Sequence, residues 1–259
     1  MAVSKLLPIA LLLFTACASE PQQLRIVSYN IHHGEGTDSV FDLERIASVI
    51  RSVEPDLVAL QEVDRATQRS SGVDQAAELG RLTGLTATYG MAMPYQGGGY
   101  GDAVLSRHPQ IASGALPLAA SLDHEPRIAT WVTIEVGGRP VTFVSTHLDH
   151  TKDPQDRVSQ ARALVAHWPR EAMGDVILVG DLNAKPGSEP MRILLEHFDD
   201  ASAGSPAHTY PSEGPVRRID WVLFRPERGW RVVESGVLDE TVASDHRALF
   251  VVLERMGGR

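Results

Sequence analysis

Short apolar runs recur along the chain and predict buried strands. The first predicted strand is 24–31, and continuous apolar runs occur at 57–60 and 176–179; short continuous runs are typical of strands covered on both faces. Gly137-Gly138 separates two further runs, which indicates a hairpin with a two-residue turn. The remaining predicted strands are 86–93, 103–106, 130–136, 140–146, 219–224, 230–238 and 248–253.

Apolar residues at helical spacing predict helices between these strands. Asp42 is a candidate N-cap for a helix whose apolar positions are 43, 46, 50 and 53, and Pro55 ends it. Three more helices are predicted at 74–82, from Asp153-Pro154 to Trp168, and from Ser188 to Phe198. Because no linker or repeat interrupts residues 24–255, this order predicts one layered α/β domain with largely antiparallel strand pairing.

The first 17 residues have the pattern of an export signal. Lys5 precedes an apolar stretch at 6–14, which is too short to span a bilayer. Two cleavage sites compete: Phe14-Thr15-Ala16-Cys17 is similar to a lipoprotein signal that would leave a lipidated Cys17, and Ala16-Cys17-Ala18 fits ordinary signal cleavage. We favour the lipoprotein, and we expect an exported protein in the periplasm or cell envelope, anchored through Cys17 or otherwise secreted.

The cysteine content and the net charge limit the disulfides and the binding partners that we expect. Cys17 is the only cysteine, so the mature domain has no disulfide and depends on its packed core. The net charge is −9, which argues against a broad basic surface for non-specific duplex binding. We expect a monomer that contacts membranes only through the lipid anchor.

Polar residues with catalytic or metal-binding chemistry stand at or just beyond the predicted strand ends. They are Asn30, Glu62, His147, Asp181, Asn183, Asp220, Asp245 and His246. Oxygen ligands and imidazoles grouped in this way suit metal-assisted attack on a phosphate ester. Glu62 fits a direct Mg²⁺ ligand, and Asn30 and Asp245 fit partial or indirect ligands; Mn²⁺ could replace Mg²⁺.

The histidines suggest acid–base chemistry. His246 paired with Asp220 would be a general base acting on water. Asp181 can orient that water, and Asn183 can donate hydrogen bonds to charge developing on the phosphate. His147 suits stabilisation of that charge or protonation of the leaving group.

Six ordered motifs together resemble the endonuclease/exonuclease/phosphatase superfamily, from about Leu24 to Leu253. They are Ser28-Tyr29-Asn30, Leu60-Gln61-Glu62-Val63-Asp64, Ser145-Thr146-His147-Leu148, Gly180-Asp181-Leu182-Asn183, Arg218-Ile219-Asp220-Trp221 and Ser244-Asp245-His246. The resemblance implies a four-layered α/β/β/α sandwich of two mostly antiparallel sheets with helices outside, and Mg²⁺-dependent phosphoester hydrolysis. It places the same residues in the metal, base and phosphate-binding roles given above.

Two positions depart from that family's pattern. His124 stands before Glu125-Pro126 where many members have a phosphate-contacting arginine, and Arg127 is the candidate replacement. Asp102 stands after Tyr100-Gly101 where relatives often have asparagine, and an extra charge near the mouth of the site would weaken polyanion binding. Arg127 and Tyr100 are therefore the candidate substrate-binding residues.

Three functions follow as hypotheses. The first is an exported phosphodiesterase or phosphatase acting on a small or lipid-linked phosphate ester. The second is an extracellular nuclease of the deoxyribonuclease I type, which would need a positive groove despite the net charge. The third is a catalytically silent binding module, ranked last because the chain keeps every ligand and the base. Tyr95 and Trp168 could line a groove, and we expect His32-His33 in a loop near the site.

Overall fold

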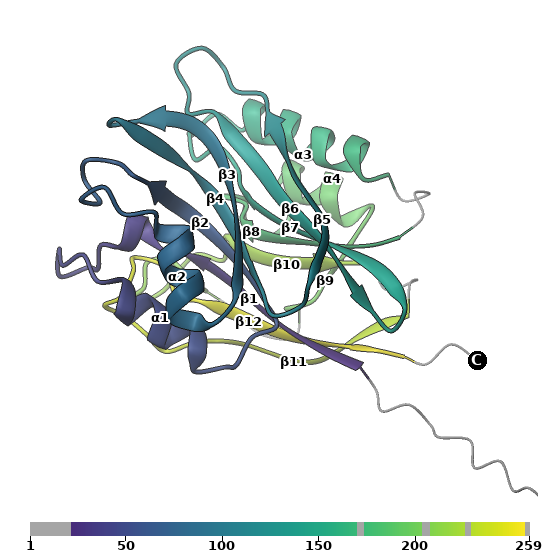
Figure 1. The fold of residues 1–259 in the computed structure, drawn as a ribbon. Helices are drawn as coiled ribbons and strands as arrows, with labels where there is room; N and C mark the ends of the chain where they lie inside the picture. Colours follow the sequence, from purple (N-terminus) through teal and green to yellow (C-terminus); the bar gives the residue numbers. More distant parts are fainter. Residues whose placement is uncertain (1–21, 170–173, 204–207, 226–228, 257–259) are drawn as a thin grey trace, which may run out of the picture.

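Two six-stranded sheets pack face to face, with two helices over the outer face of each (Figure 1). The computed structural model describes residues 22–169, 174–203, 208–225 and 229–256. The first sheet has the order β11-β12-β1-β2-β4-β3 and the second β5-β6-β7-β8-β10-β9. Among the strands of these described ranges, only the pairs β1–β2 and β7–β8 are parallel. The four-layered, mostly antiparallel sandwich expected from the sequence is confirmed.

The first and last strands of the chain belong to one sheet, and the strands between them form the other. The first sheet is built from β1 (Gln22–Asn30), β2 (Leu57–Arg65), β3 (Thr86–Tyr95), β4 (Gly98–Ser106), β11 (Trp230–Val237) and β12 (Leu249–Arg255). The second is built from β5 (Gln110–Leu118), β6 (Arg127–Val136), β7 (Arg139–His147), β8 (Asp175–Asp181), β9 (Asp199–Asp200) and β10 (Asp220–Phe224). The helices are α1 (Leu43–Arg51), α2 (Gln75–Thr83), α3 (Gln155–His167) and α4 (Glu189–Leu195), with a short 3₁₀ turn η1 (His32–Gly34).

Three apolar layers hold this arrangement together. The central layer joins the inner faces of both sheets, for example Ile26 and Leu57 of the first with Ile177 and Val222 of the second. Side chains of α1 and α2 cover the outer face of the first sheet, and those of α3 and α4 cover the second. Burial of this apolar surface is the main stabilising contribution in a domain without disulfides. Among the described residues, no helix combines the length and hydropathy of a membrane span.

Aspartate side chains cap the N-termini of the first two helices. The side chain of Asp42 accepts a hydrogen bond from the Arg45 amide at the start of α1. Asp74 does the same for the Ala77 amide at the start of α2, and Gly84 ends that helix in the left-handed conformation.

Three local predictions are wrong. The strand predicted at 103–106 begins earlier, because β4 starts at Gly98, which pairs with Tyr95 of β3. The edge strand β5 was not predicted, since it is largely exposed and has no alternating apolar pattern. Glu62 does not follow a strand but lies inside β2, at a register shift between Leu60 and Val63.

Candidate active site

The two parallel strand pairs bring the predicted polar residues to one edge of the sandwich. In the first sheet Asn30 ends β1 beside Gln61 of β2, and in the second His147 ends β7 beside Asp181 of β8. Carboxyl ends of parallel strands meet at the same edge of a sheet. Asp220 begins β10, which runs antiparallel to β8, so it lies opposite Asp181.

The Ser244–His246 segment completes this edge from the first sheet. The Ser244 hydroxyl donates to the carbonyl oxygen of Asn30 at 2.7 Å, and the His246 amide donates to the Ser244 hydroxyl oxygen at 3.2 Å. These bonds fasten the loop before β12 to the end of β1. The serine of the Ser-Asp-His motif therefore positions the histidine.

His246 and Asp220 form a buried pair across the two sheets. His246 Nδ1 lies 2.9 Å from Asp220 Oδ2, and His246 is 4 % exposed. The Thr209 hydroxyl also donates to Asp220 Oδ2. The carboxylate accepts a hydrogen bond from Nδ1–H, so the other ring nitrogen, Nε2 of His246, faces the site, 3.6 Å from Asp181 Oδ2.

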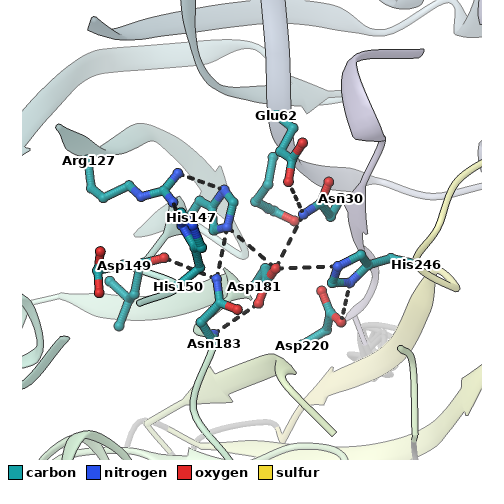
Figure 2. Close-up of polar contacts among 12 residues, drawn as sticks. Asn30, Glu62, Arg127, His147, Asp149, His150, Asp181, Asn183, Asp220 and His246 are labelled. Carbon is teal, nitrogen blue, oxygen red and sulfur yellow. Dashed lines mark hydrogen bonds and ion pairs between the residues drawn. The ribbon is translucent and has the colours of Figure 1, made fainter. Parts of the chain in front are cut away.

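Asp181 lies at the centre of the group, between two imidazoles (Figure 2). Its Oδ2 is 3.5 Å from His147 Nε2 and 3.2 Å from Asn30 Nδ2. Its Oδ1 accepts a hydrogen bond from the backbone N–H of Asn183 at 2.9 Å. The preceding Gly180 allows this approach, because a Cβ there would lie 1.8 Å from the Thr146 carbonyl oxygen.

Glu62 reaches the site because of a backbone irregularity. It has a positive φ of 58° at the β2 register shift, a conformation that costs free energy for a non-glycine residue and recurs at functional sites. Its Oε1 accepts a hydrogen bond from Asn30 Nδ2 at 3.0 Å. Asn30 therefore joins Glu62 to Asp181, and its own Oδ1 accepts the His32 amide.

The site is a polar cavity of about 430 Å³. Eight predicted residues line it: Glu62, Tyr100, Arg127, His147, Asp181, Asn183, Asp245 and His246. Asn30 and Asp220 lie beneath, 1 % exposed each, and contact lining residues. All ten residues predicted for the catalytic, metal and substrate-binding roles are thus brought together, and Cys17 lies outside the described residues.

Crowded carboxylates dominate the electrostatics. Burial and repulsion by Asp220 raise the pKa of Asp181 to about 7, against the influence of His246. Burial lowers the pKa of His246, but Asp220 and Asp181 outweigh it and raise the pKa to about 10. A divalent cation is the group that this excess of negative charge suits.

His147 has the opposite environment from His246. Burial, together with the charges of Arg127, His246 and His150, holds its pKa well below the usual value for histidine. His147 is therefore neutral at physiological pH. It can donate a hydrogen bond, but it does not carry the extra proton that a general acid would release.

Several residues of the cavity were not predicted. They include Arg69, His150, Tyr210 and Arg217. His150 follows His147 by three residues, which could have identified it. Thr209, which supports Asp220, was also missed, since no motif marks this loop. Tyr95 and His32 line the cavity, whereas Trp168 packs beside the core between α3, α4 and the second sheet.

Neither of the two residues that depart from the family pattern lines the cavity. His124 is not among the cavity residues: its Nδ1 lies 2.7 Å from Asp156, and Arg127 lines the cavity instead. Asp102 is buried in β4, and burial raises its pKa well above the usual range. The expected extra negative charge at the mouth of the site is therefore wrong, because this carboxyl is buried and does not line the cavity.

Comparisons with known proteins agree with this fold. Residues 27–246 match the model of the Endonuclease/Exonuclease/phosphatase family. The uncharacterized protein YbhP of Escherichia coli is 27 % identical over 233 residues, which cover 80 % of this chain and 90 % of that protein.

Solved structures give the same result. An endonuclease/exonuclease/phosphatase from Beutenbergia cavernae aligns with a TM-score of 0.73 and 27 % identity, over 91 % of this chain and 72 % of that one. A mannosyl-6-phosphatase from Bacteroides thetaiotaomicron aligns with a TM-score of 0.72 and 20 % identity, over 89 % and 99 % of the two chains.

Proposed function

Because the chain belongs to the endonuclease/exonuclease/phosphatase family, we propose that it is an exported metal-dependent hydrolase of phosphate esters. One observation carries the proposal: the Nε2 atom of His246, held by Asp220, faces Asp181 in a polar cavity. This is the geometry of a general base that takes a proton from water beside an electron-deficient phosphorus.

The residues around Glu62 fit a divalent cation. Glu62 and Asp245 line the cavity as carboxylates, Asn30 holds Glu62, and Asp181 is a third carboxylate of the lining. Glu62 and Asp245 would hold Mg²⁺, with Mn²⁺ as a substitute. When bound, the cation would offset the carboxylate charge, favour neutral His246 and polarise the phosphate oxygens.

The protein's own side chains would divide the remaining work. His246 accepts the proton of the attacking water, and Asp220 stabilises the imidazolium that forms. Asp181 orients the water. Asn183 and the neutral His147 donate hydrogen bonds to the oxygens on which negative charge develops.

The cavity favours a small or lipid-linked phosphate ester over a polymer. Its volume is about 430 Å³, which suits one ester group with a compact substituent. Arg69, Arg127 and Arg217 line it beside the carboxylates, so cationic side chains are available to phosphate oxygens although the net charge of the chain is −9. A nuclease of the deoxyribonuclease I type is the second candidate, supported by these three arginines.

The proposed export rests on the leader sequence. A lipid on Cys17 would place the enzyme at the cell envelope. Intact-mass measurement of the membrane fraction, with Cys17→Ser as the comparison, tests this: a mass increase of a diacylglyceryl group that the variant lacks supports the anchor, and a cleaved soluble product contradicts it.

Hydrolysis assays test the reaction. Purified mature protein is assayed with Mg²⁺ or EDTA on p-nitrophenyl phosphate, bis-p-nitrophenyl phosphate, sphingomyelin and plasmid DNA. We expect turnover that EDTA abolishes and that His246→Ala reduces by about 10²- to 10⁴-fold. His167→Ala, an exposed histidine of α3 outside the cavity, is the control. Hydrolysis by His246→Ala at the wild-type rate, with retained circular dichroism, would overturn the assignment of the base.

A further inference from the structure

Arg127 contacts two histidines at once. Its Nη1 lies 3.2 Å from His147 Nδ1, and its Nη2 lies 3.0 Å from His150 Nδ1 (Figure 2). Nη2 also lies 3.0 Å from Glu125 Oε2. Arg127 is 3 % exposed, so the surrounding protein fixes its guanidinium group and, with it, the two imidazoles.

The contact with Arg127 determines where the His150 imidazole carries its proton. A guanidinium group has only N–H donors, so a ring nitrogen that faces it must accept. Nδ1 of His150 is therefore unprotonated, and since a neutral imidazole has one N–H, its proton lies on Nε2. In His147 both ring nitrogens face donors, Nδ1 the guanidinium group and Nε2 the Asn183 Nδ2 atom at 3.0 Å, so the same argument does not apply to it.

Both rings line the cavity, but they differ in what else they contact. His147 Nε2 already lies 3.5 Å from Asp181 Oδ2. His150 is exposed, and in the described part of the chain Arg127 is the only hydrogen-bond partner recorded for it. Its Nε2–H is therefore available to a ligand, on the side of Asp181 away from His246 (Figure 2).

We propose that His150 is a substrate-binding residue that donates its Nε2–H to an oxygen of the phosphate ester, and that Arg127 is a positioning residue that holds His150 as an Nε2–H donor. The proposal rests on the function proposed above. It changes the part expected for Arg127: the arginine acts through the His150 imidazole, and the imidazole contacts the ester. A fixed neutral donor of this kind stabilises developing oxyanion charge without a change of protonation.

Two replacements of His150 separate its nitrogen atoms. His150→Gln places an amide N–H near the position of Nε2, whereas His150→Asn places one near Nδ1 and leaves the Nε2 position empty. The readouts are kcat/KM for p-nitrophenyl phosphate and the affinity for inorganic phosphate, measured by calorimetry with Mg²⁺. His167→Asn controls for loss of a histidine outside the cavity.

We expect His150→Asn to lose about three- to tenfold in both quantities, the range for one hydrogen bond. His150→Gln should lose less. Wild-type values in His150→Asn, or an equal loss in both variants, would overturn the role of His150. Phosphate affinity also separates the two proposals: if the wild type binds phosphate through His150 but hydrolyses no ester, the proposed reaction fails and the binding residue stands.

Nitrogen NMR tests the positioning by Arg127. Long-range ¹H–¹⁵N correlation spectra distinguish a ring protonated on Nε2 from one protonated on Nδ1. We expect His150 to show only the Nε2–H form in the wild type and mixed forms in Arg127→Met, which has no donor. A protonated Nδ1 of His150 in the wild type, or an unchanged His150 signal in a folded Arg127→Met, would overturn the positioning role.

Discussion

Replacement of Asp102 by asparagine should change the pH dependence of stability in a calculable way. Asp102 is 2 % exposed in β4, the backbone N–H of His147 donates to its carboxyl group, and its Oδ2 has no recorded hydrogen-bond partner in the described part of the chain. Burial raises its pKa well above the usual 3.8, although the charge of Arg127 opposes the shift. Asp102→Asn keeps the shape and removes the titration.

The magnitude follows from proton linkage. Above its unfolded-state pKa, Asp102 loses its proton in the unfolded chain but keeps it in the folded one. The wild type's free energy of unfolding therefore falls by about 1.4 kcal/mol per pH unit relative to Asp102→Asn, until the pH reaches the folded-state pKa. Each pH unit between about pH 5 and the folded-state pKa therefore adds about 1.4 kcal/mol in favour of the variant.

Urea unfolding of both proteins in EDTA, at closely spaced pH values, measures this difference. The readout is its slope, because any cost of the new amide does not depend on pH and shifts all points equally. A difference that stays constant between about pH 5 and about pH 7 would mean that Asp102 is ionised in the folded state. That result would refute the argument from burial.

Two further predictions concern the metal site and a buried ion pair. Glu62→Gln should weaken Mg²⁺ binding, measured by calorimetry, by at least about tenfold; unchanged affinity would remove Glu62 from the proposed ligands. Arg69→Met should reduce the free energy of unfolding in urea by about 3–5 kcal/mol, because it leaves the fully buried carboxylate of Asp64 without its bidentate partner. Adding Asp64→Asn should recover most of the lost free energy of unfolding. A double variant as unstable as Arg69→Met would mean that the unpaired Asp64 carboxylate is not the cause.

Much of the fold was predictable because the buried strands have sequence patterns of their own. The run 57–60 and the hairpin around Gly137-Gly138 depend on local apolar content and turn chemistry, and both occur as strands and turn in the structure. The edge strand β5 lacks such a pattern, because most of its side chains are exposed. Its place depends on tertiary pairing, which the local sequence does not encode.

The candidate site was predictable to the extent that its residues lie in short motifs at strand ends. Asp220 and His246 could be paired from the sequence because each lies beside a strand that reaches the same edge. The bulge that turns Glu62 into the cavity was not predictable, because its positive φ arises from pairing with β4. The burial of Asp102 was missed for the same reason: its environment comes from residues distant in the sequence.

The site depends on the packing of the two sheets because its main pairs cross between them. His246 belongs to the loop before β12 of the first sheet, whereas Asp220 begins β10 of the second. Asn30 of β1 likewise contacts Asp181 of β8. The central apolar layer, with Ile26 on one side and Val222 on the other, therefore sets the distances in the site as well as the stability of the domain. Since close-packed interiors transmit displacement rather than absorb it, a cavity introduced in that layer would separate the base from its carboxylate without altering either residue.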